Sequence, residues 1–108
     1  MGMYLFCQPT ENNRVWGWES SCSTWHNFVT RLIDHEAMSD EVVTSMVMMG
    51  SLNPTFPADL VPQLRADLIA ARPTLGYGKD TYESIWVDRL IKCCNVAIAN
   101  KIGLDSWW

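Results

Sequence analysis

Residues 80–101 form the stretch that most constrains how this chain can fold. On a helical wheel, apolar side chains cover most of the circumference, and a narrow wedge that includes Asp88, Lys92 and Asn95 stays polar. A helix that is apolar nearly all round must be packed against on several sides, so we expect it at the centre of the fold. The apolar residues are Ile85, Trp86, Val87, Leu90, Ile91, Cys93, Cys94, Val96, Ala97, Ile98 and Ile102.

Two other segments carry the pattern of amphipathic helices. From Trp25 to Ile33, apolar residues recur at the spacing of one helix face, directly after serine N-cap candidates. This predicts a helix over residues 23–36. A further helix is predicted over residues 59–72, where Pro62 suits the first turn. The stripe that it should bury consists of Leu60, Leu64, Leu68 and Ala71.

The run 42–49, which begins with Val42 and ends with Met49, gives mixed signals. Its β-branched residues favour a strand, whereas the acidic N-cap region before it favours a helix. We predict a helix.

The N-terminal segment gives a weaker signal for strands. Residues 3–8 alternate and are rich in aromatic and branched side chains, and residues 14–18 can return after a turn cluster. Two strands alone are marginal in water, so this hairpin must lie on the helices. The alternative is an extended cover with no sheet. Together the segments predict a mainly α protein, a compact bundle of about four helices around the C-terminal helix, with a short N-terminal strand or β-hairpin.

The end of the chain carries two tryptophans. Gly103 is expected to cap the last helix, and Trp107 and Trp108 follow it. An exposed indole pair at a chain end is a liability. We expect the tail to fold back into a groove, with a binding surface as the alternative.

Length and charge limit the class of protein. The 108 residues suit one domain, residues 1–108, and the hydrophobic fraction of 48% argues against disorder. Eight Lys and Arg face twelve Asp and Glu, so we expect no nucleic-acid partner, which would need clustered basic residues. No apolar run approaches the ~20 residues of a membrane span, and the N-terminus lacks a basic secretory signal. We therefore expect a cytoplasmic protein with no membrane partner.

No group of residues predicts an enzyme or a metal centre. The four cysteines lack CxxC spacing, and Cys93 and Cys94 would point about 100° apart on a helix, so we interpret them as core thiols. The best candidates for chemistry are Cys22 with His26, and His35 between two acids, but neither has the spacing of a known site. We expect no cofactor. A small enzyme or metal-binding protein that uses Cys22, His26 or His35 is the alternative.

The aromatic and acidic residues are better candidates for a site. Six tryptophans in 108 residues are unusual, and tryptophan serves as core filling or as an interface anchor. Trp16 and Trp18 flank Gly17 and would share one face of a strand, which makes them candidates for binding a partner. A second candidate contact, for a basic partner, is the acidic junction of the first two predicted helices. It consists of Asp34, Glu36, Asp40 and Glu41.

Short motifs in the first third of the chain resemble a known group of proteins. They are the opening Met-Gly-Met-Tyr-Leu, the Trp-x-Trp element at Trp16 and Trp18, and the Thr24-Trp25-x-x-Phe28-Val29 that opens a helix. In these motifs the chain is similar to small bacterial immunity proteins, which are encoded beside polymorphic toxins and block a cognate toxin domain. The resemblance carries over no binding residue, because such families vary in the surface that meets the toxin.

We therefore expect a protein-binding inhibitor that neutralises a cognate toxin by occluding its active site or surface. An acidic surface with aromatic anchors would suit a basic, nuclease-like toxin. The alternative partner is a host defence or regulatory protein that a phage-encoded inhibitor would block. The sequence predicts no oligomeric state.

Overall fold

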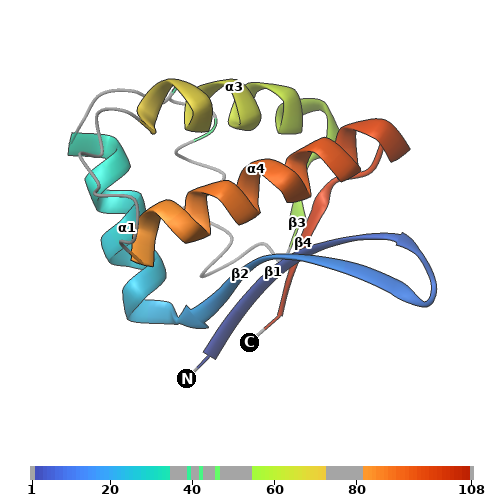
Figure 1. Ribbon diagram of the computed structural model, residues 1–108, viewed down its shortest axis with the longest axis horizontal. Coiled ribbons are helices and arrows are strands. Elements are labelled where there is room, and N and C mark those ends of the chain that lie inside the picture. The colour runs from blue at the N-terminus through green and yellow to red at the C-terminus, as the bar shows by residue number, and fades with distance from the viewer. Residues whose placement is uncertain are drawn as a thin grey trace.

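The computed structural model describes residues 2–34, 39, 42, 46, 55–72 and 82–107. Figure 1 shows α4 lying between the sheet and α3, with α1 at one end of this arrangement. In chain order the elements are β1 (Gly2–Thr10), β2 (Asn13–Ser21), α1 (Cys22–Asp34), β3 (Thr55–Phe56), a short 3-10 helix (Ala58–Leu60), α3 (Val61–Ala71), α4 (Tyr82–Asn100) and β4 (Leu104–Trp107).

The sheet has four strands in the order β2-β1-β4-β3, and all neighbouring strands are antiparallel. β1 and β2 form a hairpin. The last strand, β4, inserts between β1 and β3, with Ser106 opposite Leu5 and Leu104 opposite Phe56. The sheet is therefore completed by the two ends of the chain together.

The fold is α+β, so the predicted mainly α bundle of about four helices is wrong. β3 has two residues and β4 has four, which is too short for an alternating pattern to register. Both segments become strands through pairing with distant parts of the chain. The alternative of an N-terminal cover with no sheet is wrong too, because β1 and β2 each run for nine residues.

α1 confirms the amphipathic helix expected near residues 23–36. Its side chains Trp25, Phe28 and Val29 are buried. The helix begins after Ser21, whose Oγ accepts the backbone N–H of Thr24 at 3.1 Å, as an N-cap residue does. In the run 42–49, Val42 and Met46 are helical and buried, and the other residues lie outside the described part of the chain.

α3 buries the predicted stripe, with Leu64, Leu68 and Ala71 in the core and Leu60 packed against it. The buried carboxylate of Asp67 accepts the backbone N–H of Ser39 at 2.9 Å and the Gln63 Nε2 amide at 2.8 Å. A single α3 side chain thereby holds residue 39 close to α3.

α4 confirms the central helix predicted over residues 80–101. It packs against β1 and β2 on one side and against α3 on the other. The predicted polar wedge of Asp88, Lys92 and Asn95 is exposed. Ile85 and Ile98 are also exposed, by 48% and 37%. The buried part of the helix circumference is therefore narrower than its apolar part. From residue 85 onward, where the burial of α4 is described, the fully buried residues are Val87, Leu90, Cys93, Cys94 and Ala97.

The end of α4 differs from the expected Gly103 cap. Lys101 has a positive φ of 55°, and the N–H of Ile102 bonds to the carbonyl of Ala97 at 3.0 Å, so Lys101 occupies the left-handed capping position. Gly103 has a different function: a Cβ there would clash with the backbone carbonyl of Phe56. Glycine therefore lets the chain pass close to β3 as it enters β4.

Candidate functional site

A β-bulge in β2 separates the two tryptophans of the Trp-Gly-Trp element. Leu5 lies opposite Trp18, and the next residue of β1, Phe6, lies opposite Trp16, so Gly17 is an extra residue in β2. Without it, Trp16 and Trp18 would point to the same side of the strand. The bulge turns them to opposite faces of the sheet, and the expectation of a shared face is wrong.

At the bulge, β2 lies close against α4. A Cβ on Gly17 would lie 3.1 Å from Cys93 Cβ and 3.2 Å from Leu90 Cδ2. These distances are shorter than normal carbon–carbon contacts, so a larger residue would force Cys93 or Leu90 of α4 to shift. Gly17 thus serves both the bulge and the packing of α4.

Trp18 points to the helical side and belongs to the core. Its side chain is fully buried. Its ring centroid lies 5.1 Å from those of Trp25 and Phe28 and 5.2 Å from that of Trp86. Three elements, β2, α1 and α4, therefore meet around one indole. Trp18 was a candidate for partner binding, but this burial places it out of reach of a partner.

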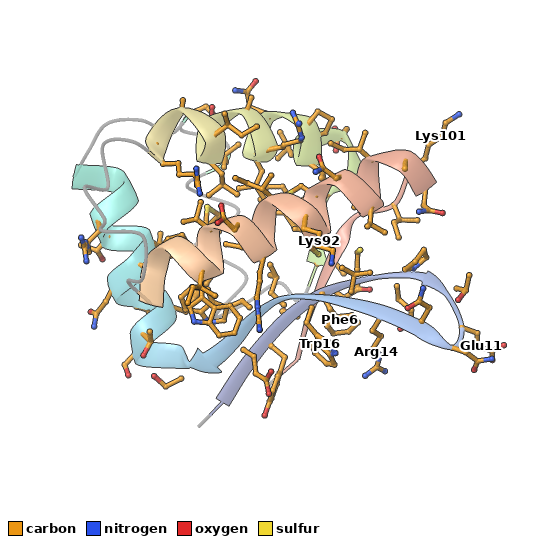
Figure 2. All side chains as sticks on the ribbon, viewed as in Figure 1. Phe6, Glu11, Arg14, Trp16, Lys92 and Lys101 are labelled. Carbon is orange, nitrogen blue, oxygen red and sulfur yellow. The ribbon has the colours of Figure 1, made fainter. Side chains whose placement is uncertain are left out.

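The opposite side of the sheet, called the outer face below, carries the more distinctive group of side chains. Cross-strand pairs place Tyr4 with Glu19, and Phe6 with both Trp16 and Asp105; directly paired residues share a face. Figure 2 shows Phe6, Arg14 and Trp16 on the side of the sheet away from α4. No described helix covers this side (Figure 1). The outer face consists of Tyr4, Phe6, Arg14, Trp16, Glu19 and Asp105.

The rings of the outer face hold one another in place. The Trp16 centroid lies 5.7 Å from that of Tyr4 and 5.2 Å from that of Phe6. The Arg14 guanidinium lies 4.9 Å from the Phe6 centroid and 6.0 Å from that of Trp16, and Arg14 Nε donates to Gln8 Oε1 at 3.3 Å. Trp16 is nevertheless 37% exposed. The result is a fixed indole with an accessible surface.

Carboxylates lie on both sides of this cluster. Glu19 is exposed on β2, and Asp105 is half-buried on β4. Burial raises the pKa of Asp105 above its ordinary value, and the nearby positive charge of Arg14 opposes that rise. Among the outer-face residues, Arg14 is the single cation.

The other residues predicted for the site are only partly described. Asp34 is the last residue of α1. Glu36, Asp40 and Glu41 lie outside the described residues, so their proposed contact with a basic partner stays a prediction. Trp107, the last residue of β4, pairs with Tyr4 through its backbone, and Trp108 lies outside the described chain.

The structure describes only part of the alternative metal or catalytic group, so that group stays a prediction. His26 is exposed on α1, Cys22 begins α1, and His35 lies outside the described residues. Within the described ranges, no three His, Cys, Asp or Glu side chains converge as metal ligands would.

Three thiols lie together between β1 and α4. Cys7 Sγ lies 3.6 Å from the carbonyl oxygen of Cys93, and Cys93 Sγ lies 3.3 Å from that of Val15. Cys7, Cys93 and Cys94 are all buried. Burial raises the pKa of Cys94 to about 12, and it raises the pKa values of Cys7 and Cys93 too. The thiolate is the reactive form, so these residues are packing groups of the core.

This burial predicts that the three thiols react slowly in the native protein. In a Cys22→Ser variant only Cys7, Cys93 and Cys94 remain. At pH 8 their reaction with a thiol reagent such as DTNB should be on the order of 100-fold slower than in urea-unfolded protein, because folding removes both access and thiolate. Rapid native-state labelling of any of them would mean that a thiol reaches the surface.

Sequence reasoning identified Trp16 but missed most of its neighbours. Tyr4 and Phe6 alternate with Leu5 and Cys7 along β1, and that period-two pattern was the available signal for two faces. Asp105 gave no signal, because it joins the outer face only when β4 pairs with β1.

Among the residues that the structure describes, no helix has both the length and the apolarity needed to cross a membrane. Comparison with family models, curated proteins and solved structures finds no match to this chain.

Proposed function

We propose that this protein is a cytoplasmic inhibitor that binds a cognate bacterial toxin through the outer face and occludes the toxin's active site or surface. One observation carries the proposal: Trp16 is 37% exposed although neighbouring rings and a guanidinium hold it in place. Exposed tryptophans of this kind are enriched among the residues that dominate binding energy at protein interfaces.

The fixed position of the Trp16 side chain on the outer face favours tight binding. Association costs the conformational freedom of each side chain that becomes fixed at an interface. Trp16 already packs against Tyr4 and Phe6, so little of its freedom remains to be lost. Its exposed surface is then available for the favourable burial of apolar area.

The motifs that resemble immunity proteins contribute to this face. Tyr4 lies in the opening Met-Gly-Met-Tyr-Leu, and Trp16 is the first residue of the Trp-x-Trp element. By contrast, Trp18, Trp25 and Phe28 belong to the buried ring cluster. The resemblance therefore combines residues that maintain the fold with residues that are available to a partner.

A nucleic acid is a poorer candidate for the same face. Glu19 and Asp105 would repel phosphates. Arg14 lies over Phe6 at 4.9 Å, and it occupies a ring face on which a base would otherwise stack. Protein binding accounts for both the aromatic residues and the carboxylates.

The proposal is tested by co-expressing the protein with the toxin domain encoded beside it and counting surviving bacteria. The unaltered protein should restore growth. Trp16→Ala should abolish protection at an equal level of folded protein, since truncation of such an anchor costs about 2 kcal/mol or more of binding, roughly 30-fold in affinity.

Ile69→Ala is the matched control. Ile69 is 43% exposed on α3, on the side of the protein that carries the helices, and its variant should protect as well as the unaltered protein. The proposal fails if the toxin kills at full expression of the unaltered protein. It also fails if Trp16→Ala and Ile69→Ala protect equally.

A further inference from the structure

The charges of the outer face have an ordered arrangement around the aromatic residues. Along β2, Arg14 lies on one side of Trp16, and Glu19 lies on the other side, beyond the bulge. Across the sheet, Glu19 pairs with Tyr4, while Asp105 pairs with Phe6 from β4. The two carboxylates therefore flank the β1 aromatics from opposite neighbouring strands.

Arg14, the cation of the outer face, already contacts other residues of the protein. Arg14 lies over the Phe6 ring and donates to Gln8, so it covers the hairpin side of the cluster. On the Glu19 side of Trp16 lies the Tyr4 ring, with its centroid 5.7 Å from that of the indole, and the exposed Glu19 pairs with Tyr4 across the strands. A positively charged group there would gain both an ion pair and a cation–π contact.

The wider charge distribution has the same sign. The whole chain has a net charge of −4, and the outer face has two carboxylates, Glu19 and Asp105, against one guanidinium, Arg14. An acidic protein attracts a basic partner and raises its association rate.

We infer that the outer face receives a lysine or arginine side chain of the partner, which lies against Trp16 on its Glu19 side, while Asp105 adds negative charge from β4 beyond the Phe6 ring. This inference rests on the proposed protein-binding function and adds the chemistry of the recognised group. The partner's cation complements the two carboxylates, and the indole of Trp16 covers its apolar stem.

Defined peptides test this chemistry even when the toxin itself is not in hand. The ¹⁵N-labelled protein is titrated with capped tri-arginine, capped tri-glutamate and hexathymidylate, and the Trp16 indole N–H is followed by NMR. We expect saturable shifts at Trp16, Glu19 and Asp105 with tri-arginine alone. The dissociation constant should be on the order of 1 mM and should rise with salt, because salt screens exposed charges.

Charge variants make the test specific. Glu19→Gln should weaken tri-arginine binding about threefold, and the double variant Glu19→Gln/Asp105→Asn about tenfold. Glu11→Gln is the matched control: it removes the same charge from the hairpin turn, where Glu11 lies away from Trp16 (Figure 2), and should change binding less than twofold. Glu19 is exposed, so its variant should fold even if the double variant does not.

Several outcomes would overturn the inference. These are a shift of Trp16 with tri-glutamate or hexathymidylate, no shift with any of the three probes, or equal weakening by Glu11→Gln and Glu19→Gln. The co-expression result separates this failure from that of the proposed function. If protection depends on Trp16 but not on Glu19, the proposed inhibitor function stands and the inferred recognition of a cation fails. If tri-arginine binds but the protein gives no protection, the recognition of a cation stands and the proposed inhibitor function fails.

Discussion

Replacing Trp18 with alanine is expected to lower the free energy of unfolding by about 3–5 kcal/mol. The indole is fully buried and contacts rings from α1 and α4, so its loss leaves a cavity at the point where three elements meet. Urea unfolding followed by far-UV circular dichroism measures the change without relying on the fluorescence of the other tryptophans.

Trp16→Ala is the matched control for this substitution, because the two residues are separated by one glycine in the same strand. Trp16 keeps 37% of its surface exposed, so its removal should cost about 1 kcal/mol. Comparable losses for the two variants would mean that the bulge does not turn the two indoles to opposite faces. The same contrast supports the functional test, since Trp16→Ala should impair binding in a protein that still folds.

Replacing Leu90 with alanine is expected to cost about 2–5 kcal/mol. Leu90 is fully buried in α4, and its Cδ2 lies 3.2 Å from the position that a Cβ on Gly17 would occupy. It therefore fills the space between the central helix and the bulge of β2. Its loss leaves a cavity between α4 and β2, and such cavities close only in part.

Ile85→Ala on the same helix provides the control. Ile85 is 48% exposed, so its truncation should change the free energy of unfolding by less than about 1 kcal/mol. A loss below about 1 kcal/mol for Leu90→Ala would contradict the central position of α4. The two measurements together distinguish cavity formation from a change in helix propensity, because leucine, isoleucine and alanine differ little in that propensity.

The helices could be predicted because their signal is local. The spacing of apolar residues from Trp25 onward depends only on residues within one helix. The residues at that spacing, Trp25, Phe28 and Val29, are the ones that are buried. The same reasoning predicted the centrality of α4. It erred at Ile85 and Ile98, because an apolar residue on a helix is buried only where another element covers it.

The candidate site could be predicted only in part. Trp16 was identified from its residue type, and so was Trp18, but the structure places them on opposite sides of the sheet. The difference arises from the one-residue bulge at Gly17, which lies against Leu90 and Cys93 of α4. A strand pattern read from sequence assumes unbroken alternation, and it cannot locate such an extra residue.

By itself, the sequence determined where the amphipathic helices lie and that the last helix is central, and it put Trp16 among the candidates for a site. The tertiary structure decided that β3 and β4 exist, that Trp18 is core, and that Asp105 joins Trp16 on one face. The physical reason is the distance along the sequence between the residues whose contacts form each element. Helical periodicity reflects contacts between residues three and four apart, whereas a short strand exists only through pairing with a partner that is distant in sequence, here Leu5 with Ser106.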